Sequence, residues 1–188
     1  MEEHTLAGKV LIATPHIRDA RFEKSVIFIC AHDEHGAMGL TLNKPLTDLN
    51  LEDLLSDLKI DCDKNSQIKL PVYIGGPLEP ERGFLLHSAL HNREDSTKVG
   101  KDFGVSGTLE TLKSVTDQAK LPKDIMFALG YAGWDAGQLE KELKEGAWLV
   151  ADAPTDMVFE TERDMLWEES MAHLGINPTL LTGTVGQA

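Results

Sequence analysis

The chain has 188 residues, of which 41% are hydrophobic and 26% are charged. This length predicts a single domain over residues 1–188, with enough apolar residues for a core that needs neither disulfides nor a metal. The 18 lysines and arginines are outnumbered by 31 aspartates and glutamates, which gives a net charge of −13. Nucleic acids and anionic membranes are negatively charged themselves, so we expect direct binding to neither.

No stretch reaches the roughly 18 consecutive apolar residues of a membrane-spanning helix, and no signal-peptide pattern opens the chain. We therefore expect a cytoplasmic protein. The chain has two cysteines. Cys30 ends an apolar run and is expected to be a buried free thiol, whereas Cys62 lies in a charged segment. A disulfide between them is the less favoured alternative.

The first half of the chain predicts mainly strands. Short apolar segments rich in β-branched residues are typical of strands, and here they are residues 9–13, 25–31, 37–43, 72–74 and 82–87. The second and third of these are expected to form a hairpin, and Pro45 should end the third strand. Leucines at helical spacing indicate a helix that begins after Asn50 as its N-cap. The polar residues 61–69 and 91–103 are expected to be loops or loosely paired.

The second half of the chain adds helices between strands. Strands are expected at residues 125–130, 147–151 and 157–159. One helix should follow Thr108 to about residue 119, and a last helix should begin at Thr161, bury Trp167 and Met171, and end at Gly175. The tail from Pro178 should be weakly structured. Because hairpins come first and helices are inserted unevenly, we expect an α+β domain with a mixed sheet.

A glycine-rich bend that ends in Trp134 is followed at once by a helix with complete start signals. Asp135 is expected as the N-cap, and Gln138 should reach back to the backbone amide of Asp135. Trp134 and Leu139 should pack together as a hydrophobic staple, and the helix should stop at Gly146. The glycines before this helix would allow close approach of either a ligand or another chain segment.

Short segments with a distinctive sequence are spread in order along nearly the whole chain. They are residues 8–15, Asp19, Phe22, Ser25, Val26, residues 36–40 and 43–45, residues 75–77 and 82–87, residues 128–134 and 137–140, Trp148, Trp167 and residues 174–175. Together these signatures resemble the YqgE/AlgH family of bacterial proteins. The resemblance implies an α+β fold with a partly barrel-like, bifurcated sheet surrounded by helices. It implies no established reaction.

The same family carries a transcriptional-regulator label, which the charge of this chain does not favour. A DNA-binding domain normally concentrates lysines and arginines on one face. The sequence shows neither a basic run nor a helix-turn-helix, and its net charge is −13. We expect any regulatory role to act through a protein partner.

Two local patterns invite a chemical interpretation. His32, Asp33, Glu34 and His35 could approach one metal ion, but their spacing matches no usual zinc pattern, and a solvated polar turn is favoured. The segment that begins at Gly75 lacks the Lys-Ser/Thr pair of a phosphate-binding loop, so a tight turn is favoured there. We expect no cofactor and no metal.

Strand alternation separates two other candidates. Arg82 and His87 should point to opposite faces of their strand, and a structural role is favoured for His87. The staple already explains Trp134, whereas nothing explains Tyr131, which makes Tyr131 the better candidate for lining a pocket. No serine follows the pattern of a nucleophile elbow near Gly130.

These observations leave two hypotheses from different classes. The favoured one is a non-enzymatic binding or regulatory module whose recessed surface recognises a protein or a small molecule. Its candidate binding residues are Asp19, Asn43, Gly75, Gly76, Pro77, Arg82, His87, Gly130, Tyr131, Gly133 and Gln138. The alternative is a hydrolytic or phosphoryl-type enzyme that uses Asp19, Arg82 and His87, which requires these three side chains to meet at a common point. A third possibility, that the signatures specify only the fold, also stays open.

Overall fold

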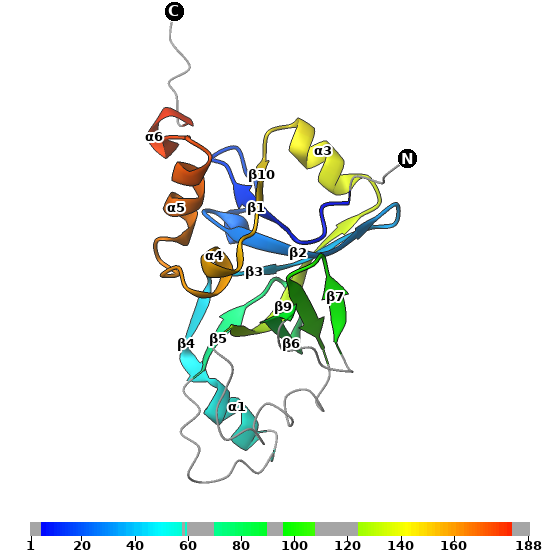
Figure 1. Cartoon of the computed structure of the whole chain (residues 1–188), viewed down its shortest axis with the longest axis vertical. Coiled ribbons are helices and arrows are strands. Elements are labelled where there is room, and N and C mark those ends of the chain that lie inside the picture. The colour runs from blue at the N-terminus through cyan, green and yellow to red at the C-terminus, as the bar shows by residue number, and fades with distance from the viewer. Residues whose placement is uncertain (1–4, 58, 60–69, 90–95, 108–123, 182–188) are drawn as a thin grey trace, which may run out of the picture.

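A ten-stranded sheet forms the centre of the computed structural model, and helices surround it (Figure 1). The structure describes residues 5–57, 59, 70–89, 96–107 and 124–181. The strands are β1 (Lys9–Ala13), β2 (Val26–Asp33), β3 (Gly36–Thr41), β4 (Pro45–Asn50), β5 (Pro71–Ile74), β6 (Leu78–Ser88), β7 (Thr97–Val99), β8 (Phe103–Ser106), β9 (Ile125–Asp135) and β10 (Trp148–Asp152). The helices are the 3-10 turn η1 (Ala20–Phe22) and α1 (Leu51–Asp57), α3 (Gln138–Lys144), α4 (Thr155–Phe159), α5 (Leu166–His173) and α6 (Pro178–Leu181).

The sheet branches at β9. Its main path runs β10-β1-β2-β3-β9-β6-β8-β7, and its pairings are antiparallel. The end of β9 pairs with β3, whereas residues 127–129 of the same strand pair in parallel with β5, which in turn pairs with β4. The predicted α+β class and mixed sheet are therefore confirmed, and so are the bifurcation and the curled, half-barrel sheet that the family resemblance implies (Figure 1).

Two glycine segments cross in direct backbone contact where the sheet branches. The amide of Gly75 donates to the carbonyl of Leu129 at 2.8 Å. A Cβ atom on Gly76 would overlap the backbone of Tyr131, and one on Gly130 would overlap the carbonyl oxygen of Gly76. Gly130 also has a φ of +71°, which favours glycine. Of the two expected reasons for these glycines, a ligand or another chain segment, the structure shows the second: the glycines let two segments of the chain lie in direct backbone contact.

The core consists of three apolar clusters, and β1 separates two of them. Val10 and Ile12 face the larger cluster, which α5 covers with Leu166, Trp167 and Met171. Leu11 and Ala13, on the opposite face of β1, belong to the cluster that α3 covers. The third cluster lies under α1 and includes Leu51 and Leu55. Burial on both faces explains why β1 is an uninterrupted apolar run rather than an alternating one.

Several predicted elements are confirmed with small shifts at their ends. The hairpin forms from β2 and β3, and Asn50 accepts from the amide of Asp53 at 3.0 Å at the start of α1. Trp167 and Met171 are buried, and α3 ends at Lys144 before Gly146, as expected. The predicted helix after Thr108, the loop 61–69 and Cys62 lie outside the described residues.

The strand β9 is longer than predicted, and this changes the start of α3. Pairing with β3 carries the strand past Gly130 and Gly133 to Asp135, so the turn into the helix lies at residues 136–137 and not before Trp134. The N-cap of α3 is Gly137, and the prediction that Asp135 caps the helix is wrong. The reverse contact is present, since Gln138 Oε1 accepts from the amide of Asp135 at 3.0 Å. Trp134 and Leu139 lie in one apolar cluster, as the staple requires.

Four other expectations were wrong about an element or its boundary. Residues 157–159 belong to the helix α4, not to a strand, because a three-residue apolar segment carries no periodicity that separates the two. Pro45 begins β4 instead of ending β3, at a first strand position where its missing N–H is tolerated. Thr161 does not cap the last long helix, which begins at Leu166, and the tail from Pro178 starts with the short helix α6. In the described part of the segment 91–103, residues 97–99 form the short strand β7, which pairs with the unpredicted strand β8.

Two further observations concern chemistry and environment. Cys30 is a free cysteine, and desolvation by burial raises the pKa of its thiol to about 12, which keeps it protonated and unreactive at neutral pH. Among the described residues, no helix is both long enough and apolar enough to cross a membrane.

The backbone crossing predicts a large effect of Gly76→Ala. The added methyl group would meet backbone atoms that cannot rotate away, so the free energy of unfolding should fall by at least about 3 kcal/mol, the upper end of ordinary overpacking. Gly175→Ala is the control, because Gly175 has a positive φ but nothing within 4 Å, and should cost only about 1 kcal/mol. Urea denaturation measures both values, and equal losses in the two variants would contradict the crossing.

Candidate functional site

A cavity of about 690 Å³ lies between the segment around η1, the end of β9, the starts of β6 and β10, and the helix α3. Small-molecule sites in proteins have volumes of about 300–1,000 Å³. The lining residues are His16, Ile17, Arg18, Asp19, Arg21, Phe22, Pro77, Leu78, Gly133, Trp134, Gln138, Lys141, Glu142, Glu145, Ala147 and Trp148. They come from three stretches that are far apart in the sequence and that the sheet brings together.

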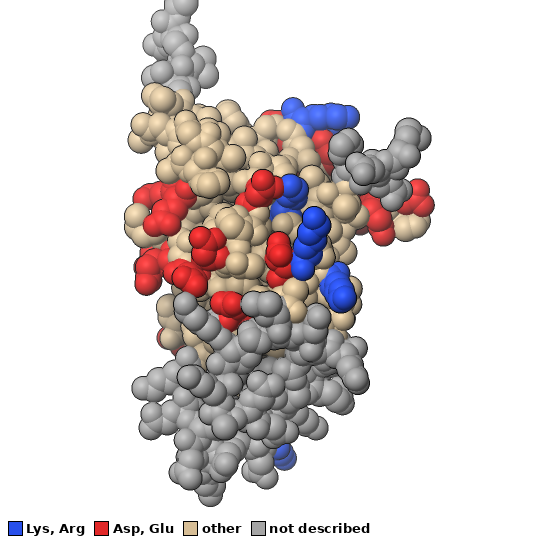
Figure 2. Space-filling model, viewed as in Figure 1, with Lys and Arg blue, Asp and Glu red and all other residues tan. Residues whose placement is uncertain are grey.

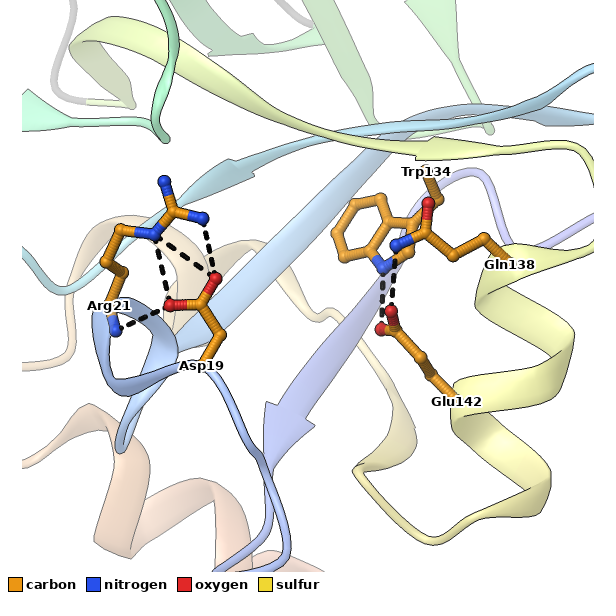
Figure 3. A network of polar contacts seen from close by, with 5 residues as sticks. All are labelled: Asp19, Arg21, Trp134, Gln138 and Glu142. Atoms are coloured by element: carbon orange, nitrogen blue, oxygen red, sulfur yellow. Dashed lines mark hydrogen bonds and ion pairs between the residues drawn. The ribbon is translucent and has the colours of Figure 1, made fainter.

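One wall of the cavity is a pair of tryptophans held by a single carboxylate. Trp134 and Trp148 both donate their indole N–H to Oε2 of Glu142, at 2.9 and 2.7 Å. The other oxygen of Glu142 accepts from Gln138 Nε2 at 2.9 Å (Figure 3). The two indole rings meet edge to face with centroids 6.0 Å apart, and Phe22 packs in the same way on Trp148 at 5.8 Å. This wall is therefore aromatic, and its polar groups are already paired.

The opposite side of the cavity carries an ion pair. Arg21 donates to the carboxylate of Asp19 through Nε at 3.0 Å and through Nη2 at 2.7 Å. The backbone amide of Arg21 adds a 3.0 Å bond to the same carboxylate, which thereby caps η1. In Figure 3 this pair lies across from Trp134, Gln138 and Glu142. The hydrogen bonds from the Arg21 side chain lower the pKa of Asp19 below its usual value of 3.8.

Other groups around the cavity are not committed to partners. Within the described part of the chain, the side chains of Arg18, Lys141 and Glu145 make no hydrogen bond or ion pair. Leu78 is 43% exposed, so much of its apolar surface is open to a ligand. The cavity therefore combines an apolar surface with charges that are still available to a ligand.

The structure places four predicted binding residues, Asp19, Pro77, Gly133 and Gln138, in the lining of this cavity. Gly75, Gly76 and Gly130 form the backbone crossing beneath it, and their contacts are with one another rather than with the cavity. Tyr131 is half-buried and packs edge to face on Phe84 at 5.9 Å, outside the lining. Asn43 joins two loop ends, since it accepts from the amide of Val26 at 2.9 Å and donates to the carbonyl of Lys24 at 2.8 Å.

The proposed catalytic trio does not meet. Arg82 is exposed and pairs with Glu79 at 3.0 Å, whereas His87 is buried and lies 2.7 Å from Ser96 Oγ. They occupy opposite faces of β6, five residues apart, which is about 16 Å along an extended strand. Neither lines the cavity that contains Asp19. The geometry therefore does not support the enzyme hypothesis.

The polar turn at residues 32–35 divides its side chains among separate partners. His32 Nε2 lies 2.7 Å from Glu140 Oε1, and its Nδ1 accepts from the amide of Leu6 at 3.0 Å. Asp33 instead accepts from the amide of His35 at 2.8 Å. His32 thus links the hairpin to α3 and to the start of the chain.

Sequence reasoning missed Glu142 and Trp148 as site residues. A spacing of four residues puts Glu142 on the same side of α3 as Gln138, and a buried indole N–H needs an acceptor. These two signals could have suggested the carboxylate. Which tryptophans donate to this carboxylate depends on β10 lying beside α3, and the sequence does not reveal that arrangement.

The shared carboxylate predicts a stability loss in Glu142→Ala. Two buried indole N–H groups would lose their acceptor, so unfolding should become easier by about 2–3 kcal/mol. Glu142→Gln keeps one acceptor oxygen and should lose only about 1 kcal/mol. Glu145→Ala removes a cavity carboxylate that has no described partner and should change stability by less than about 0.5 kcal/mol. Chemical denaturation compares the three variants, and equal effects at positions 142 and 145 would contradict the network.

The ion pair predicts a titration effect in Arg21→Gln. Without the guanidinium, the pKa of Asp19 should rise toward 3.8, as measured by carboxyl-carbon NMR. A lowered folded-state pKa stabilises the protein above the unfolded value and loses that contribution as pH falls through the folded value. The stability difference between wild type and variant should therefore be constant above about pH 5 and shrink below pH 3.8. An unchanged Asp19 titration would refute the assigned cause.

Comparisons with known proteins support the family resemblance over the whole chain. A family model described as AlgH-like matches residues 10–179. A UPF0301 protein of Paracoccus denitrificans is 42% identical over 190 residues, covering 100% of this chain and 99% of the relative. A UPF0301 protein of Ruegeria pomeroyi is 44% identical over 184 residues, covering 97% and 99%.

Solved structures agree with the fold. The solution structure of the AlgH protein from Pseudomonas aeruginosa matches with a TM-score of 0.78 at 35% identity, covering 100% of this chain and 98% of that one. A crystal structure from Corynebacterium diphtheriae matches with a TM-score of 0.72 at 24% identity, covering 98% and 95%, and supports the fold alone. With a family model that spans most of its length and relatives of about 40% identity, the chain belongs to the AlgH-like (YqgE/AlgH) family.

Proposed function

We propose that this protein is a non-enzymatic binding module that takes a small molecule, or a segment of a protein partner, into the cavity between η1 and α3. The observation that carries the proposal is the convergence of three distant chain segments on one cavity of about 690 Å³. Residues of the family-like signatures, among them Asp19, Pro77 and Gln138, come together there although they are scattered along the sequence.

The chemistry of the lining supports binding over catalysis. Among the described residues of the lining there is no serine, threonine, cysteine or tyrosine, and so no hydroxyl or thiol nucleophile beside a base. The carboxylate of Glu142 accepts from three side-chain N–H groups, and that of Asp19 is held by Arg21. These two carboxylates therefore hold the walls of the cavity in place.

The charge distribution supports a partner other than DNA. Acidic side chains gather over α4 and α5 on the face shown in Figure 2, while the lysines and arginines on that face lie apart from them. Such a surface repels a polyanion. A regulatory role would therefore act through the cavity and a bound partner.

A comparison of retained molecules tests this function. The doubly substituted variant Leu78→Glu/Lys141→Glu changes two exposed residues at the cavity. Ile74→Glu/Lys98→Glu makes the same changes at exposed positions outside the lining, and Ile74 at 44% exposure matches Leu78 at 43%. Each protein is purified natively from bacterial cells and then denatured, and the released small molecules and co-purified proteins are identified by mass spectrometry.

We expect at least one molecule to be retained by the wild type and the Ile74/Lys98 variant and lost from the Leu78/Lys141 variant. Circular dichroism should show that all three proteins are folded. If both variants retain the same molecules as the wild type, or if the wild type retains nothing, the cavity is not the functional site.

A further inference from the structure

We infer that the cavity ligand is a small organic anion with an apolar body, such as an aryl carboxylate. The inference rests on the proposed function, because it assigns a chemical class to the occupant of the same cavity. The reasons are the apolar surface that remains open to a ligand and the imbalance between free cations and free anions around it.

The apolar side of the cavity is fixed and free of unpaired donors. Since both indole N–H groups already donate to Glu142, the tryptophan wall offers carbon surface rather than hydrogen bonds. Phe22 and Ile17 are only half-buried, and Leu78 is 43% exposed. Covering these side chains removes apolar area from water, which favours a ligand with an apolar body.

The charged groups of the cavity favour an anion. Its lining contains three lysines and arginines and three carboxylates, whereas the whole chain has 18 against 31. Asp19 is neutralised by Arg21. Glu142 keeps its negative charge, because its three donors are neutral, but both of its oxygens already accept hydrogen bonds from Trp134, Trp148 and Gln138. Arg18 and Lys141 then remain as free cations, with Glu145 as the free anion, among the described lining residues.

The net charge of −13 does not cancel this local preference. At physiological ionic strength, charges further away than about 8 Å are largely screened. No residue of α4 or α5 is in the described lining, so the free charged groups of the lining itself are the ones that a ligand meets directly. Arg18 adds a planar guanidinium that can bind a carboxylate through two parallel hydrogen bonds.

Three naphthalene probes that differ only in charge test this inference. They are 2-naphthoate, the neutral 2-naphthalenemethanol and the cationic 2-naphthylmethylamine, each titrated by calorimetry at about 0.15 M salt, the ionic strength at which distant charges are screened. We expect naphthoate to bind at least about tenfold more tightly than the amine, because each of two partly exposed cations contributes a few-fold. The preference should shrink in 0.5 M salt, since salt screens exposed charges.

Tryptophan NMR signals locate the binding. The indole N–H signals of Trp134 and Trp148 should shift on addition of naphthoate, because both residues line the cavity. The chemical shift of the Trp167 indole N–H should not change. Its indole donates to the carbonyl of Ala13 at 2.8 Å, and its ring belongs to the apolar cluster on the opposite face of β1 from Trp134 and Trp148. A shift of Trp167 alone would place the probe in another cavity and would overturn the inference.

Charge-removing variants separate this inference from the proposed function. Arg18→Gln/Lys141→Gln should weaken naphthoate binding by about tenfold and leave the neutral alcohol unchanged. Lys98→Gln/Lys101→Gln, which alters two exposed lysines outside the lining, should change neither. Equal affinity for naphthoate and the amine, or no binding of any probe, would overturn the inference. The proposed function fails separately, when cavity variants retain the same molecules as the wild type.

Discussion

The contact on which the rest of the structure depends is the crossing of two backbones at the branch of the sheet. Gly75 and Gly76 run directly against Gly130 and Tyr131, closer than any side chain would permit. This approach lets β5 pair with one part of β9 while β3 pairs with the other part. It also sets the start of β6, and with it the positions of Pro77 and Leu78 at the cavity. A fold requirement and the geometry of the site therefore share the same glycines.

The cavity combines a rigid side with an adjustable one. Its aromatic wall is built from β9, β10 and α3. The indole N–H groups of Trp134 and Trp148 in this wall both donate to Glu142. Across from this wall, the residues around η1 are largely exposed. Their ion pair joins Asp19 and Arg21, which are only two positions apart in the sequence. Rigid walls define the shape that a ligand must match, whereas exposed side chains can adapt to it at small cost. This division suits recognition better than it suits the fixed geometry that catalysis requires.

Much of the fold could be predicted from the sequence, and the failures have physical causes. The runs at β1 and β2 are apolar because both of their faces are buried, which makes them easy to identify as strands. The extension of β9 beyond Gly130 could not be predicted, because pairing with β3 overrides the low strand propensity of glycine. Four of the sixteen described lining residues were predicted because they stand in family-like signatures: Asp19, Pro77, Gly133 and Gln138. Arg18, Glu142 and Trp148 were missed because their role depends on which distant elements become neighbours.

The two hydrogen bonds that Trp134 and Trp148 donate to Glu142 also restrict how α3 can move. One tryptophan belongs to β9 and the other to β10, so a single side chain of α3 is tied to two strands that are not hydrogen-bonded to each other. Sliding or tilting α3 would break both ties at once. The helix α3 therefore holds β9 and β10 in a fixed relative position. A substitution at Trp134, Glu142 or Trp148 removes a donor or the acceptor, so it changes which side chains are tolerated at the other two positions.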